Sequence, residues 1–215
     1  MEMTIEPKGI EREQLLKRGV LLEAATVCWN AIEGIIAVWA GTLASSVALI
    51  AFGVDSFVET TSGAVLWWRL RAELKGGDDP ERIERIERRA ARVAGTILFS
   101  LAIYVMLDAG RRLLGFGPAA RESLVGIVVT VIALAVMPFL GWMKLRTSLA
   151  LGSRALRADA YETITCAWLS LTTLAGLLFN AMLGLWSADP IAALVIVPLV
   201  LREGIEAWRG DDESN

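Results

Sequence analysis

An apolar run with two acids inside it, residues 47–69, restricts the fold of this chain more than any other feature. The run, VALIAFGVDSFVETTSGAVLWWR, exceeds the roughly 20 residues that a helix needs to cross the hydrocarbon core of a bilayer. Asp55 and Glu59 are four positions apart, so a helix places both carboxylates on one face, one turn from each other. Two like charges at this spacing repel unless a proton or a cation lies between them. The pair therefore points to a metal site inside a membrane.

The composition supports a membrane protein with several spans. Of the 215 residues 55% are hydrophobic, and the mean hydropathy is +0.53. Soluble domains contain only about 45–50% apolar residues. The excess falls into six runs separated by short charged segments, which predicts an all-α membrane protein, a bundle of six transmembrane helices.

The six runs set the expected organisation of the chain. An amphipathic cytoplasmic segment, 1–18, precedes a transmembrane unit, 19–209, and a short cytoplasmic tail, 210–215, follows it. We expect the spans at residues 19–39, 43–68, 90–114, 123–142, 155–183 and 189–208. An even number of spans places both termini on one side of the membrane.

The positive charges predict which side that is. All Lys and Arg residues except Arg111, Arg112 and Arg121 fall in the termini or in the connectors on the same side as the termini. Lys144 is counted among the connector residues on that side, because it follows the expected end of the fourth span. Lys and Arg accumulate in cytoplasmic loops, so we expect both termini in the cytoplasm, at the inner membrane of a bacterium.

Other compositional features exclude several classes of function. The net charge of −3 leaves no basic surface for nucleic acid. The absence of His and of a phosphate-binding glycine motif argues against a soluble enzyme, and no prosthetic group is expected. Cys28 and Cys166 both fall in apolar runs, which argues against a disulfide framework.

The fifth run repeats the arrangement of the second. In SRALRADAYETITCAWLS, Glu162 and Cys166 are again four positions apart and share a helix face. Carboxylate oxygen and thiolate sulfur are ligands for zinc and for other transition metals. Magnesium and calcium prefer sites made of oxygen alone, so the cysteine counts against them. A cysteine on an apolar face is also compatible with a simple packing role.

Three stretches, SSVALIAFGVDSFVET, SRALRADAYETITCA and ADPIAALVIVPLVLREGIEAW, resemble the cation diffusion facilitator family of divalent-metal transporters. The resemblance extends to the six-span layout and covers most of the chain. It carries the family's two ligand pairs to Asp55 and Glu59, and to Glu162 and Cys166. It implies a homodimeric metal/proton antiporter that removes divalent cations from the cytoplasm by alternating access.

The chain departs from the family pattern in two ways. The second ligand pair is Glu and Cys instead of His and Asp, so Fe²⁺, Mn²⁺, Co²⁺ and Cd²⁺ remain alternatives to Zn²⁺, the first expectation. The family's cytoplasmic C-terminal domain does not follow the last span here, so the chain resembles a short branch made of the membrane part only.

Several alternatives stay open at this point. Asn30 and Glu33 in the first span could hold helices together, complete the cation cage or carry the exchanged proton. A small organic-cation exporter also uses a membrane-buried Glu, although six spans and two ligand pairs argue against it. A metal-binding membrane protein without transport activity is the other alternative.

Overall fold

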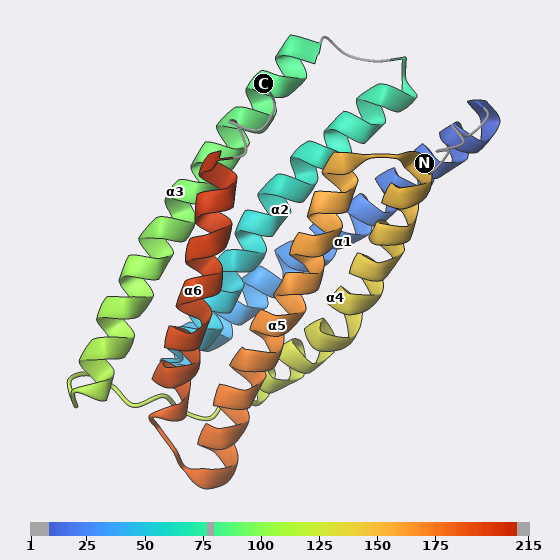
Figure 1. Cartoon of the computed structure of the whole chain (residues 1–215). Coiled ribbons are helices and arrows are strands. Elements are labelled where there is room, and N and C mark those ends of the chain that lie inside the picture. The colour runs from blue at the N-terminus through green and yellow to red at the C-terminus, as the bar shows by residue number, and fades with distance from the viewer. Residues whose placement is uncertain (1–8, 77–79, 210–215) are drawn as a thin grey trace, which may run out of the picture.

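The computed structural model describes residues 9–76 and 80–209, and within these ranges the chain forms an antiparallel bundle of six α-helices (Figure 1). They are α1 (Gly9–Ala44), α2 (Val47–Leu74), α3 (Pro80–Leu113), α4 (Leu124–Leu151), α5 (Arg154–Leu183) and α6 (Ala188–Arg209). The start of α1 and the end of α6 lie at the same end of the bundle, as six crossings require. The predicted all-α bundle is confirmed, whereas the segments 1–8 and 210–215 lie outside the described residues.

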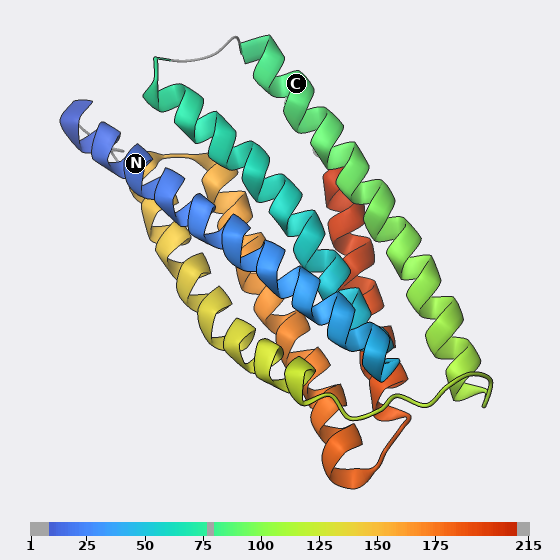
Figure 2. The same ribbon diagram turned by 180° about the vertical axis from the view of Figure 1, so that it is seen from behind.

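Five of the helices in the described part of the chain, α1 to α5, are long and apolar enough to cross a membrane. Helix α6 has 22 residues, but it carries Asp189 in its first turn and Arg202, Glu203 and Glu206 near its end. These charges reduce its apolar length below that of the other five. Helix α6 nevertheless belongs to the bundle and packs along α3, as the views from both sides show (Figures 1 and 2).

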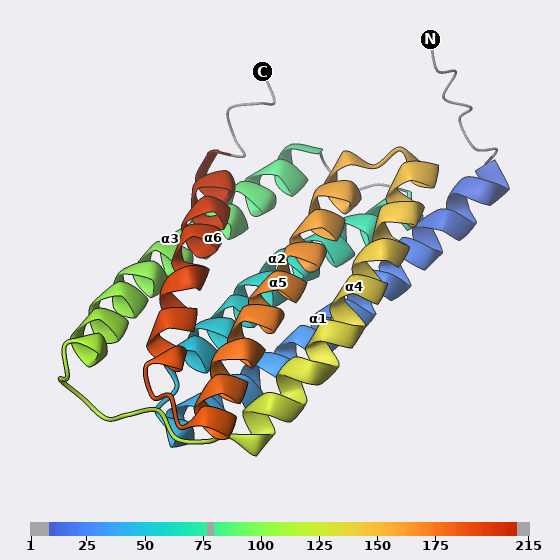
Figure 3. The same cartoon turned by 60° about the horizontal axis from the view of Figure 1, so that its bottom comes forward.

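Helix α2 occupies the middle of the bundle. It packs against α1, α3, α5 and α6, and Figure 3 shows it running behind α5. Its approach to α1 depends on glycine, because a Cβ added at Gly53 would lie 2.8 Å from the backbone nitrogen of Val38. Small residues allow this kind of close approach between membrane helices. The acids of α2 are consequently enclosed by protein on several sides.

The start of α2 is fixed to the start of α6. The Ser46 hydroxyl caps α2 by accepting a hydrogen bond from the Leu49 nitrogen, at 3.1 Å. The same hydroxyl donates to the Asp189 carboxylate, which also accepts from the Val47 nitrogen at 2.8 Å. Asp189 therefore satisfies backbone and side-chain donors of another helix, and this holds α6 beside α2.

Helices α4 and α5 are separated by only two residues, Gly152 and Ser153. The sequence predicts a longer connector, beginning directly after residue 142. Instead α4 continues to Leu151, where Gly152 ends it in the left-handed conformation at φ 69°. Lys144 is therefore not a connector residue, and the prediction that placed it in a cytoplasmic loop was wrong.

Candidate metal site

Three of the four predicted ligands meet inside the bundle. Asp55 and Glu59 lie on the same face of α2, and Cys166 faces them from α5. A carboxylate oxygen of each acid and the Cys166 sulfur all lie within 4.8 Å of one another. All three side chains are buried, with Asp55 and Cys166 each 1% exposed. One cation at the centre of this group could contact all three.

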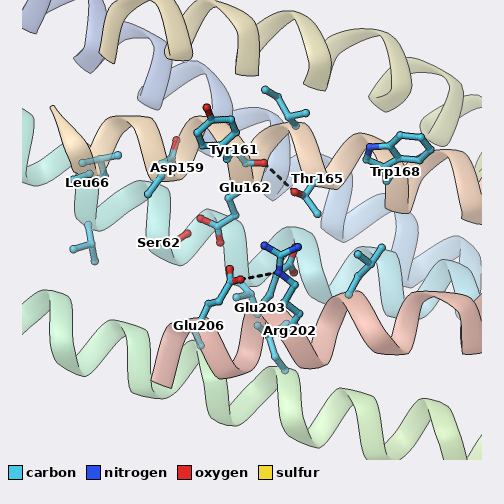
Figure 4. A pocket seen from close by; sticks show the side chains of 18 residues that line it. Ser62, Leu66, Asp159, Tyr161, Glu162, Thr165, Trp168, Arg202, Glu203 and Glu206 are labelled. Carbon is cyan, nitrogen blue, oxygen red and sulfur yellow. Dashed lines mark hydrogen bonds and ion pairs between the residues drawn. The ribbon is translucent and has the colours of Figure 1, made fainter. Parts of the chain in front are cut away.

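The fourth predicted ligand, Glu162, lies outside that compact group. It is one turn before Cys166 on α5 and is half-buried. Its carboxylate points toward Ser62 of α2, on the wall of a cavity (Figure 4). It is still near enough to act electrostatically on Asp55 and Glu59.

Helix α1 supports the two acids of α2 through Asn30 and Glu33, both fully buried. The Asn30 amide donates a hydrogen bond to Glu59 Oε2 at 2.8 Å. The Ser56 hydroxyl donates to Glu33 Oε1 at 3.0 Å. Asn30 thus orients a predicted ligand, and Glu33 adds a carboxylate next to the site.

Several oxygen atoms around the site have no hydrogen-bond partner among the described residues. They include Asp55 Oδ2, Glu33 Oε2 and Asn30 Oδ1, all of them buried. Buried polar atoms are nearly always paired, so each such atom requires an explanation. Oxygen atoms of this kind, together with a cysteine sulfur, form a donor set that suits a transition-metal cation.

A cavity of about 750 Å³ adjoins this group (Figure 4). It is lined by α2, α3, α5 and α6, and its polar residues include Ser62, Glu162 and Glu203. It also reaches Asp159 near the start of α5 and Glu206 near the end of α6. The cavity thus lies in the half of the bundle that the charge pattern predicts to face the cytoplasm.

Glu203 is a site residue that sequence reasoning missed. Its side chain is near enough to that of Asp55 for the two to hydrogen-bond to each other. The sequence signal was present, because an acid in the last third of an expected span is costly and calls for a partner. Glu203 has no ligand-type residue four positions before or after it, so it does not fit the spacing of the two predicted pairs.

A second charged cluster lies beside the site and joins α1, α4 and α5. The Lys144 ammonium donates to Asp159 Oδ2 at 2.5 Å and to Glu23 Oε2 at 3.1 Å. It also lies 3.3 Å from the Thr163 hydroxyl. The side chains of Lys144 and Glu23 are both 0% exposed. A buried cation is therefore balanced by two carboxylates, at a position where the sequence predicts a connector residue.

Comparisons with known proteins agree with the geometry. A family model described as the cation efflux transmembrane domain matches residues 24–209. The chain is 27% identical over 169 residues to an uncharacterised transporter of Synechocystis sp., covering 78% of this chain and 54% of that protein. It is 24% identical over 179 residues to an uncharacterised transporter of Methanocaldococcus jannaschii, covering 82% of this chain and 62% of that protein. The chain thus spans less than two thirds of the length of these relatives.

The family match covers most of the six-helix bundle, and it includes all four predicted ligands. Both relatives are described as transporters, which agrees with a role other than catalysis. The resemblance drawn from the three sequence stretches is therefore confirmed. This integral membrane protein belongs to the cation efflux family of transporters.

Proposed function

We propose that the protein exports a divalent transition-metal cation, with zinc as the first candidate, in exchange for protons. The observation that carries this proposal is the convergence of Asp55, Glu59 and Cys166 within 4.8 Å of one another. Glu162 supplies a fourth ligand, a third carboxylate, from the cavity wall, one turn from Cys166. Two helices thus provide the ligands, so a relative movement of α2 and α5 could change access to the site.

The ligand chemistry selects the class of cation. A thiolate among carboxylates suits Zn²⁺, and it also accommodates Fe²⁺, Mn²⁺, Co²⁺ and Cd²⁺. The all-oxygen preference of Mg²⁺ and Ca²⁺ disfavours them at a site with Cys166. The ligands bind metal only when they are deprotonated, so metal and protons compete for the same groups. This competition is the physical basis for the proposed antiport.

The cavity suggests the order of events. Because it lies in the half expected to face the cytoplasm, a cation enters there and passes Glu162 before it reaches Asp55 and Glu59. Movement of the helices then opens the site to the opposite side, where protons displace the metal. We further propose that the protein works as a homodimer in a bacterial inner membrane, with both termini in the cytoplasm. The family resemblance and the distribution of Lys and Arg support this arrangement.

Transport by purified protein in proteoliposomes tests the proposal. Asp55→Asn removes one ligand charge and keeps the shape of the side chain, so metal uptake should fall to the level of empty liposomes. Glu13→Gln, at an exposed acid paired with Lys17, is the matched control and should transport normally. Full transport by the Asp55 variant would refute the assignment. Uptake assays with Zn²⁺, Fe²⁺, Mn²⁺, Co²⁺ and Cd²⁺ identify the cargo.

A further inference from the structure

We propose that Glu203 of α6 is a further ligand of the transported cation, which it binds together with Asp55 on the cavity side of the site. This inference rests on the proposed function, because it adds a third helix to the same metal site. It also gives α6 a chemical role, because the two predicted ligand pairs come from α2 and α5.

The first observation is the contact between two acids. The side chains of Asp55 and Glu203 are near enough to hydrogen-bond to each other, and Asp55 is 1% exposed. Two carboxylates this close repel strongly in a medium of low dielectric constant unless a proton or a cation is shared between them. A metal cation held between them removes the repulsion and uses both groups as ligands.

The second observation is an unsatisfied atom. Asp55 Oδ2 is buried and has no hydrogen-bond partner within the described part of the chain. The basic residue next to Glu203 in sequence, Arg202, forms an ion pair with Glu206 at 2.7 Å. The side chains of that pair are 73% and 61% exposed, and both residues also line the cavity. Asp55 therefore keeps an oxygen that no described residue satisfies, and the guanidinium of Arg202 is paired with Glu206.

The third observation is access. Figure 4 shows Glu162 extending from α5 and Glu203 from α6 into the same cavity, with Ser62 of α2 close to Glu162. A cation that enters this cavity meets both carboxylates on its way to Asp55. Binding between Asp55 and Glu203 would connect α6 to α2, so occupancy of the site would alter how these two helices pack.

A purely structural role for Glu203 makes a different prediction. If Asp55 and Glu203 only share a proton, Glu203→Gln keeps the hydrogen bond, because the amide donates to Asp55 in place of the acid. Metal binding would then be unchanged. If Glu203 is a ligand, the same substitution removes a charged donor. Mutating a residue that only orients a ligand already lowers metal affinity by about 10–100-fold. Removing a ligand itself should therefore weaken metal binding by at least about tenfold.

The experiment measures binding of Zn²⁺ and Co²⁺ to the full chain in lipid nanodiscs by equilibrium dialysis, together with the shift in Tm that metal produces. The variants are Glu203→Gln, Asp55→Asn and the matched control Glu13→Gln, which neutralises an exposed acid of α1 outside the cavity and should bind metal like the wild type. We expect at least about tenfold weaker binding and a smaller metal-induced Tm shift for Glu203→Gln. Its metal-free Tm should equal or exceed that of the wild type, because a repulsion is removed.

The outcomes separate this inference from the proposed function. Wild-type affinity in Glu203→Gln, with binding lost in Asp55→Asn, would overturn the role of Glu203 and leave the site itself intact. No binding by the wild type would overturn both. If Glu203→Gln has a low metal-free Tm, Glu203→Asp provides the second test. Restoring a carboxylate should then recover part of the affinity, and no recovery would refute the ligand role.

Discussion

Replacing Lys144 with methionine should strongly destabilise the protein, because two acids depend on that one buried cation. Lys144 and Glu23 are 0% exposed, and Asp159 is 12% exposed. Removing one partner of a buried ion pair leaves an uncompensated charge and costs about 3–5 kcal/mol. Here two carboxylates lose their partner, so we expect the free energy of unfolding to decrease by about 3–5 kcal/mol or more.

The assay is equilibrium unfolding in detergent micelles, followed by circular dichroism. Arg12→Gln is the matched control, because the pair of Arg12 with Glu73 is 2.8 Å long and its side chains are 47% and 41% exposed. Exposed pairs contribute only about 0–1 kcal/mol, so this variant should unfold almost like the wild type.

A compensated variant tests the cause of the effect. Combining Lys144→Met with Glu23→Gln and Asp159→Asn removes all three charges, and replacing a whole buried ion pair with neutral groups is often close to neutral. The triple variant should therefore recover most of the stability that the single substitution loses. A single-variant loss below about 1 kcal/mol, or a triple variant as unstable as the single one, would refute the charge-balance argument.

Two further predictions concern the supports of the site. Asn30→Leu removes the hydrogen bond that orients Glu59, so metal affinity should fall about 10–100-fold in the dialysis assay, and unchanged affinity would contradict that role. Gly53→Ala forces a Cβ against α1 and should cost about 1–3 kcal/mol in the unfolding assay. Gly110→Ala, where a Cβ would meet nothing within 4 Å, should cost nothing, and equal effects of the two substitutions would contradict the close-packing argument.

Much of the architecture follows from local patterns in the sequence. Apolar runs of sufficient length predict the helices, and a spacing of four predicts that Asp55 and Glu59 share a face. The proximity of Cys166 to that pair required the family resemblance, because no local pattern brings α2 and α5 together. The structure places all three within reach of one cation.

The misplacement of Lys144 has a physical origin. A lysine near the end of an apolar run normally marks the membrane boundary, because its charge reaches the aqueous interface. Its burial depends on two acids from other helices, Glu23 and Asp159, which the sequence of α4 does not reveal. The sequence marks Glu203 as an acid that needs a partner, but that partner, Asp55, belongs to a helix about 150 positions earlier.

X-ray absorption at the zinc edge of the metal-loaded protein tests the central claim most directly. The account predicts one sulfur ligand at about 2.3 Å with the remaining ligands oxygen at about 2.0–2.2 Å. Cys166→Ser should remove the sulfur contribution, whereas Cys28→Ser, at the exposed cysteine of α1, should leave it unchanged. A zinc spectrum without sulfur in the wild type, or one that Cys166→Ser leaves unaltered, would contradict a cation site formed by Asp55, Glu59 and Cys166.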